Sequence, residues 1–122
     1  METPKSTNKY RDLEERTFRF AKDSRDFVKQ LPRTTSNIEY GKQLIRSSGS
    51  QAANYIEANE SLSKKDFIFR IKICRKEAKE SDLWLNLCDI DNERIELERK
   101  NLITEVGELR KIFSSILDKS TG

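Results

Sequence analysis

Apolar and small residues between positions 63 and 88 recur at alternating steps of four and three, the spacing of one face of a packed helix. The positions on this face are Phe67, Ile71, Cys74, Ala78, Ser81, Leu85 and Cys88. A second apolar stripe runs nearly opposite the first and consists of Phe69, Ile73, Leu83 and Leu87. A surface helix in a small monomer needs only one apolar face. Two faces therefore predict that this helix either lies at the centre of the fold or packs against another chain.

The chain before this helix predicts two more helices. The first begins at about Lys9 and ends before Pro32, because the residue that precedes a proline is pushed out of the α region. Its apolar and small face consists of Leu13, Thr17, Phe20, Ala21, Ser24, Phe27, Val28 and Leu31. Phe18 lies off this face, which makes it either an edge contact or an interface residue.

The second helix follows a short connection at residues 33–36 and runs to about Asn59, with Thr35, Ser36 or Asn37 as candidate caps. We expect its buried face to consist of Gly41, Leu44, Ile45, Ser48, Ala52, Tyr55 and Ile56. Residues 47–53 have a loop-like composition, so a break at Gly49 is the alternative. The apolar period passes through this segment without a change of phase, which favours a continuous helix whose small residues let a neighbouring helix approach closely.

A fourth helix is predicted after the central one. Residues 60–62 form a turn, Ser63 caps the central helix, and an acidic, turn-prone segment at residues 89–92 ends it, although the pattern leaves this last boundary open. The fourth helix, from about Glu93, carries on one side Ile95, Leu102, Val106, Leu109, Phe113, Ile116 and Leu117. Four helices with short links predict an all-α, antiparallel up-down-up-down four-helix bundle. We place this bundle at residues 9–118, with flexible tails at residues 1–8 and 119–122.

Length and composition agree with a single small domain. The chain has 122 residues, of which 37% are charged and 34% are hydrophobic. Cys74 and Cys88 are fourteen residues apart, about 21 Å along one helix, which is too far for a disulfide. We expect both to be buried in a protein from a reducing compartment. No apolar run reaches transmembrane length and residues 1–8 lack the apolar region of a signal peptide, which favours a soluble, cytoplasmic protein.

The residue types that most enzymes need are scarce. The chain has no histidine, the commonest general base and metal ligand. Four acids, Glu57, Glu60, Glu77 and Glu80, suggest a carboxylate cluster, but metal sites in helix bundles also use Glu-x-x-His pairs. No glycine-rich phosphate loop, nucleophile elbow or paired-cysteine motif is present. The sequence therefore predicts a protein that is not an enzyme, with no catalytic residue, metal ligand or cofactor.

The net charge of +3 is small but unevenly distributed, since basic residues dominate between residues 62 and 79 and acidic ones between 82 and 108. The candidate nucleic-acid surface is a basic ridge on the central helix that consists of Lys64, Lys65, Lys72, Arg75, Lys76 and Lys79. No aromatic residue interleaves this ridge, so stacking on single strands is not indicated. Two alternatives stay open: the ridge pairs with the acidic segment of a neighbouring subunit, or the two charged faces are simply solvated.

The candidate subunit contact combines the second apolar stripe with one of its edges. Arg70, Glu77 and Trp84 recur every seven residues along this edge. The predicted interface residues are Phe69, Arg70, Ile73, Glu77, Leu83, Trp84 and Leu87. A ring in which each subunit offers one face and receives another would cover the stripe. A solvated edge with a half-buried Trp84 is the alternative.

Three segments resemble a known family. They are residues 52–59 (AANYIEAN), residues 63–68 (SKKDFI), and residues 76–80 (KEAKE) followed by Trp84 and Leu85. Within residues 40–87 the chain resembles the small four-helix-bundle proteins encoded in intervening sequences of bacterial 23S ribosomal RNA genes, which are often labelled ribosomal protein S23-like. The resemblance implies a ring-shaped homopentamer. A related branch comprises the accessory proteins of diversity-generating retroelements, whose basic pentamers contact nucleic acid and reverse transcriptase, and the net charge of +3 is low for that branch.

These observations describe an assembly and not a reaction. We expect a non-enzymatic homo-oligomeric scaffold, a structural or protein-docking ring with weak binding to RNA or DNA. The alternative is a nucleic-acid-binding accessory protein that works with a reverse transcriptase. The expected partners are further copies of this chain, RNA or DNA, and a reverse transcriptase or another protein, without a membrane.

Overall fold

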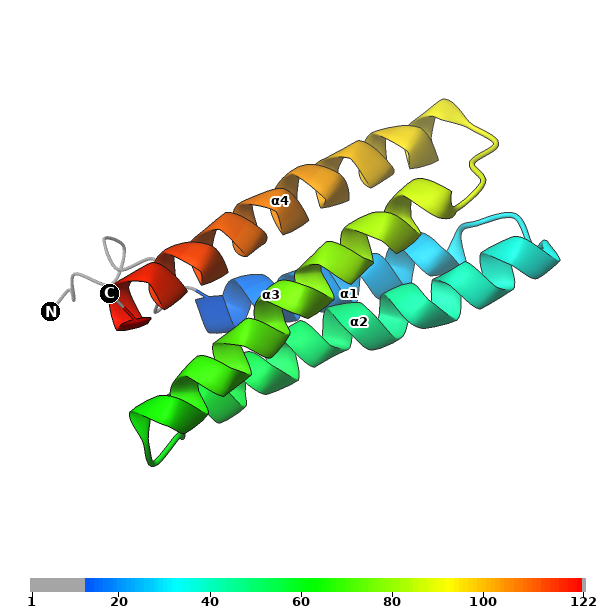
Figure 1. Ribbon diagram of the computed structural model, residues 1–122. Coiled ribbons are helices and arrows are strands. Elements are labelled where there is room, and N and C mark those ends of the chain that lie inside the picture. The colour runs from blue at the N-terminus through cyan, green and yellow to red at the C-terminus, as the bar shows by residue number, and fades with distance from the viewer. Residues whose placement is uncertain (1–12, 122) are drawn as a thin grey trace, which may run out of the picture.

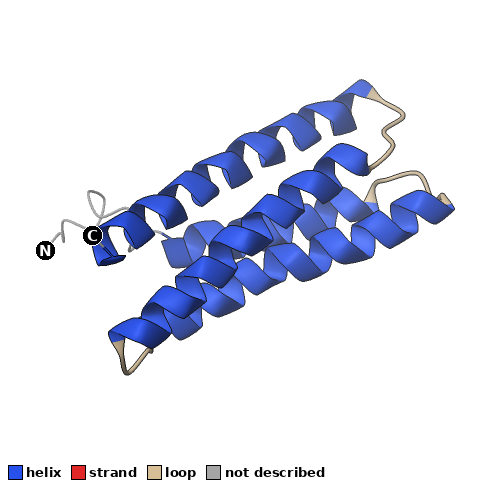
Figure 2. Cartoon of the chain, in the orientation of Figure 1, coloured by secondary structure: helices blue, strands red, loops and turns tan. Residues whose placement is uncertain are grey.

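The computed structural model describes residues 13–121, which form four helices and contain no strand (Figure 1, Figure 2). The helices are α1 (Leu13–Lys29), α2 (Thr35–Asn59), α3 (Lys64–Leu87) and α4 (Glu93–Thr121). Consecutive helices run in opposite directions and are joined by short connections (Figure 1). The all-α prediction is confirmed. The predicted start of the first helix at Lys9 and the predicted tail at residues 1–8 lie outside the described residues.

Helix α3 is not the central element that its two apolar faces allowed, since each of the four described helices lies against two others. It lies against both α2 and α4, whereas α1 lies against α2 and α4 and across the core from α3. The predicted inner face of α3 is buried from Ile71 to Cys88, with Phe67 partly buried at its start. Cys74 and Cys88 are both buried and free, as predicted.

Polar side chains define where the helices begin. The Oγ1 of Thr34 accepts a hydrogen bond from the backbone N–H of Asn37 at 3.1 Å, and the Oγ of Ser63 accepts one from Asp66 at 3.0 Å. Ser63 is thus the predicted cap, but the prediction of Thr35, Ser36 or Asn37 for α2 is wrong. Thr34 is the cap because its extended backbone lets the hydroxyl reach the amide three residues later.

Three further predictions concern the continuity of α2 and the two ends of α4. Helix α2 continues without a break through Gly49, which the apolar period favoured. Helix α4 begins at Glu93, where the side chain of Asn92 accepts a hydrogen bond from the N–H of Ile95 at 2.9 Å. It extends to Thr121, three residues past the predicted end of the bundle at residue 118, so residues 119–121 are helical.

The buried side chain of Asn37 joins two connections at one end of the molecule. Its Nδ2 donates to the carbonyls of Pro32, at 2.9 Å, and Asp89, at 3.1 Å. Its Oδ1 accepts from the backbone N–H of Asp89 at 2.8 Å. The α1–α2 and α3–α4 connections therefore lie side by side.

The buried face of α2 differs from the prediction. Ile45 and Ile56 were expected in the core but are 43% and 50% exposed. Their places are taken by polar or small residues that the apolar pattern missed, namely Asn37, Ser47, Gln51 and Ala58. The physical reason is a hydrogen-bonded contact with α3: the hydroxyls of Ser47 and Ser81 are 2.7 Å apart. This contact turns the polar side of α2 inward and leaves both isoleucines outside.

Candidate functional site

The second apolar stripe of α3 lies on the outer surface of the molecule. Phe69, Leu83 and Leu87 are between 41% and 56% exposed, and Ile73 is partly exposed. We call these four residues the outer stripe of α3. None of them belongs to the core or packs against it. Within residues 13–121, therefore, no helix covers this stripe.

The edge residues of the predicted interface face α2 of the same chain. The Nη1 of Arg70 donates to the Oδ1 of Asn54 at 2.9 Å. The ring of Trp84 stacks on Tyr40, with centroids 5.9 Å apart. These side chains and Glu77 thus join α3 to α2, and their role at a subunit contact stays a prediction.

A charged cluster interrupts the outer surface between α2 and α3. The guanidinium of Arg46 lies 3.2 Å from the carboxylate of buried Glu77 and 2.9 Å from that of Glu80. The hydrogen bond that Arg46 donates to Glu77 is the main cause that raises the pKa of Arg46. Since a buried carboxylate needs a partner, the ion pair with Arg46 satisfies Glu77 and links α2 to α3.

Four members of the predicted basic ridge converge with a residue from α4. Lys72, Arg75, Lys76 and Lys79 line a surface hollow of about 490 Å³ together with Arg110 and Ser114. We call the five cations the basic cluster. The Nη1 of Arg75 donates to the Oγ of Ser114 at 3.5 Å. In the described part of the chain no carboxylate pairs with the basic cluster.

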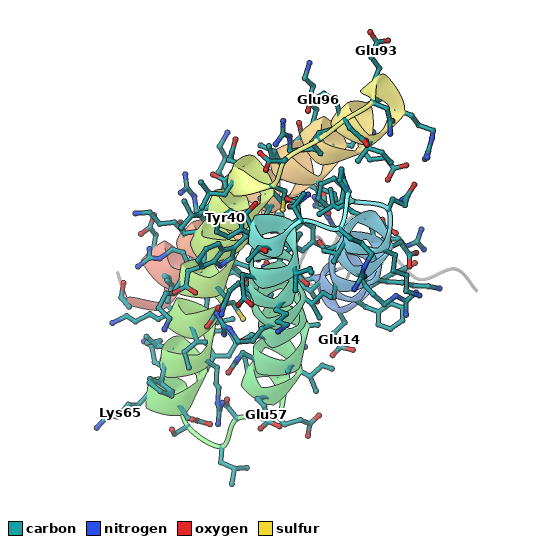
Figure 3. All side chains as sticks on the ribbon, turned by 90° about the vertical axis from the view of Figure 1, so that its right-hand side faces the viewer. Glu14, Tyr40, Glu57, Lys65, Glu93 and Glu96 are labelled. Carbon is teal, nitrogen blue, oxygen red and sulfur yellow. The ribbon has the colours of Figure 1, made fainter. Side chains whose placement is uncertain are left out.

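The other two ridge residues, Lys64 and Lys65, stand exposed in the first turn of α3 and do not line the hollow. Figure 3 shows Lys65 at the end of the molecule opposite Glu93 and Glu96. Arg110 was not predicted, because charge was compared along the sequence and not across the pairing of α3 with α4. An antiparallel pairing of α3 with α4 would have placed Arg110 beside the ridge.

The cysteines offer no reactive site. Burial is the main cause that raises the pKa of Cys74 to about 12 and that of Cys88 to about 11. Both side chains are therefore protonated at neutral pH, when the thiol is a poor nucleophile and metal ligand. Residues 13–121 hold no group of three or more histidine, cysteine, aspartate or glutamate side chains that could bind a metal ion.

None of the four described helices combines the length and apolar character needed to cross a membrane. The two surface features that stand out are the outer stripe of α3 and the basic cluster.

Comparisons with known proteins agree with this architecture. A crystal structure of a protein of unknown function from the S23 ribosomal protein family of Bacteroides thetaiotaomicron superposes with a TM-score of 0.75 and 27% sequence identity. The match covers 86% of this chain and 97% of that one. A comparison with curated proteins gives no match. The family model described as 23S rRNA-intervening sequence protein matches residues 11–115. Because this match spans most of the chain, the protein belongs to the 23S rRNA-intervening sequence protein family.

Proposed function

We propose that this protein is a non-enzymatic scaffold that assembles into a closed ring of identical subunits, with the outer stripe of α3 in each subunit contact. The observation that carries the proposal is the exposure of this stripe on a helix whose other face is already fully packed. Monomeric proteins seldom leave several large apolar side chains exposed along one helix. Five subunits is the number that the family resemblance implies.

Energetics support burial of the stripe in an assembly. Complete burial of a leucine or phenylalanine side chain contributes about 1.5–3 kcal/mol. Phe69, Leu83 and Leu87 are each about half exposed, so each retains on the order of 1 kcal/mol that only a partner can supply. A closed ring repeats this contribution at every contact and leaves no stripe uncovered.

The test compares one double substitution with a single-substitution control by sedimentation velocity. Phe69→Ser with Leu83→Ser removes apolar area from the stripe, and we expect the assembly to dissociate to monomers that keep their helical circular dichroism. The matched control is Leu97→Ser, because Leu97 is also exposed but lies on α4. Dissociation by the control alone, or an unchanged assembly in the stripe variant, would overturn the proposal.

A second candidate function is nucleic-acid binding, alone or as an accessory protein that works with a reverse transcriptase. The basic cluster favours it, since five unpaired cations gather around one hollow. Such a surface contacts phosphates without reading sequence, and its affinity falls as salt rises.

A triple charge reversal separates this function from a role in assembly. Lys72→Glu, Lys79→Glu and Arg110→Glu should abolish binding of a fluorescein-labelled RNA in anisotropy titrations while the native mass stays unchanged. If the basic cluster instead joins subunits, the same substitutions will lower the native mass. Unchanged RNA binding would contradict nucleic-acid binding by the basic cluster.

A further inference from the structure

A second exposed apolar surface lies between α1 and α2. It includes Ile38, Ile45 and Ile56 of α2, which are all exposed. Ile38 and Ile45 line a groove of about 250 Å³ whose other apolar walls are Val28, Leu31 and Pro32. We call this surface the α1–α2 face. Like the outer stripe of α3, it has no cover within residues 13–121.

We propose that the α1–α2 face receives the outer stripe of α3 from a second copy of this chain. This inference rests on the proposed ring and names its second surface. A head-to-tail ring requires two different surfaces on each subunit. Figure 3 shows α2 between α3 and α1, so the two apolar surfaces lie on either side of α2.

The two surfaces have the same length. Ile38 and Ile56 are eighteen residues apart on α2, and Phe69 and Leu87 are eighteen residues apart on α3. At 1.5 Å per residue both surfaces span about 27 Å. A stripe from one subunit can therefore lie along the whole length of the α1–α2 face of the next.

The hydrogen bonds of Asn37 fix the register of this pairing. They hold the start of α2 beside the end of α3, so Ile38 and Leu87 lie at the same end of the molecule. Rotation about a ring axis parallel to the helices leaves the height of each residue unchanged. Ile38 of one subunit then faces Leu87 of the next, and Ile56 faces Phe69.

Side-chain sizes in the middle of the two surfaces are complementary. Ala52 is fourteen residues from Ile38, and Ile73 is fourteen residues from Leu87, so the larger side chain meets the smaller one. Gly49 adds space nearby, because a Cβ placed there would meet nothing within 4 Å.

Charges at one end of the molecule are complementary as well. The groove of the α1–α2 face carries Lys29, Arg33 and Lys42 on its rim. Asp91 and Glu93 follow α3 at the same end, where the hydrogen bonds between Asn37 and Asp89 hold the start of α2 beside the α3–α4 connection. Neither acid forms an ion pair among the described residues. Docking of the stripe would bring Asp91 and Glu93 of one subunit to the basic rim of the groove on the next.

The test is disulfide trapping with Lys42→Cys and Leu83→Cys, because Lys42 is four residues from Ile38 and Leu83 is four residues from Leu87. Under mild oxidation, followed by a maleimide quench before denaturation, the double variant should give a ladder of cross-linked chains up to the size of the ring. Each single variant should stay uncross-linked, because the two positions meet only each other. The native cysteines are buried, so the wild-type chain is the background control. Leu83→Cys combined with Leu97→Cys is the matched control and should give no ladder.

Three results would overturn the inference and leave the ring itself standing: no ladder in the double variant, self-cross-linking of Leu83→Cys alone, or an equal ladder in the matched control. A wild-type protein that is monomeric would instead refute the proposed ring. Charge reversal is an independent check. Arg33→Glu with Lys42→Glu should weaken the ring, so that it dissociates at protein concentrations at which the wild-type ring stays intact. Adding Asp91→Lys with Glu93→Lys should restore the ring at those concentrations.

Discussion

At the scale of single residues, the contact between α2 and α3 depends on buried polar groups. Gln51 is fully buried, and its Nε2 donates to the Oγ of Ser81 at 3.0 Å. Its Oε1 has no hydrogen-bond partner in the described structure. Ser47 and Ser81 still bond each other without Gln51. The Nε2 of Gln51 also donates to the carbonyls of Ser47 at 3.4 Å and Glu77 at 3.5 Å, so the side chain combines volume with long, weak hydrogen bonds.

This balance predicts different effects for two substitutions of Gln51. Gln51→Ala leaves a cavity and should lower the free energy of unfolding by about 2–4 kcal/mol. Gln51→Met keeps the volume and removes the unpaired oxygen, so it should change the free energy of unfolding by less than about 1 kcal/mol. Urea unfolding measures both. Equal losses would show that the hydrogen bond to Ser81 dominates.

The thiol of Cys74 makes stability depend on pH. Burial disfavours the thiolate and so raises the pKa of the Cys74 thiol from its ordinary value of 9.0 to about 12 in the folded protein. A raised pKa contributes stability that is complete below pH 9 and is lost as pH rises toward the folded pKa. Each pH unit in this window removes up to about 1.4 kcal/mol.

The expected observation is a difference between two proteins, since lysine and tyrosine also titrate there. The wild-type chain and Cys74→Ala are unfolded with urea at pH 8, 9.5 and 10.5. The stability advantage of the wild type should shrink as pH rises. An advantage that is constant across this range would contradict the burial of an ionisable thiol in the core.

At the scale of helices and connections, Asn37 holds two turns together. Its amide makes three hydrogen bonds to backbone groups of Pro32 and Asp89. Asn37→Ala would leave these groups unpaired and should lower the free energy of unfolding by about 2–4 kcal/mol. Hydrogen exchange should show faster exchange of the Asp89 amide. The matched control is Asn86→Ala, because Asn86 is exposed and bonds only within α3.

The four helices also show what the sequence pattern can predict. The inner face of α3 follows a regular apolar period, so its orientation was predicted correctly. The orientation of α2 was not, because polar Ser47 and Gln51 face inward while Ile45 and Ile56 face outward. Apolar periodicity assumes that burial follows hydrophobicity, and a hydrogen-bonded contact such as Ser47 with Ser81 breaks that assumption.

At the scale of the whole molecule, function depends on how surfaces from different helices combine. The outer stripe of α3 was predicted because it lies on one helix. The α1–α2 face and the contribution of Arg110 to the basic cluster were not, because each joins residues from two helices whose relative rotation the pattern leaves open. The same limit left the intrachain contacts of Arg70 and Trp84 unforeseen.

The proposed ring places apolar and charged surfaces in separate roles. The α1–α2 face and the outer stripe of α3 join subunits through apolar side chains, whereas the basic cluster between α3 and α4, beside Leu83 of the stripe, offers cations. Five copies would present five such clusters around the ring. Assembly and polyanion binding should therefore respond to different substitutions.

The most direct test of the ring is the native mass of the wild-type protein, measured by light scattering at low and high salt. One chain has a mass of 14.3 kDa, so a pentamer would have a mass of about 72 kDa. We predict that this mass persists at high salt, because the contact is chiefly apolar. If nucleic acid is bound, the ratio of absorbance at 260 nm to absorbance at 280 nm should fall as salt rises. A monomer near 14.3 kDa at all concentrations would contradict the account, and the outer stripe of α3 would then need another explanation.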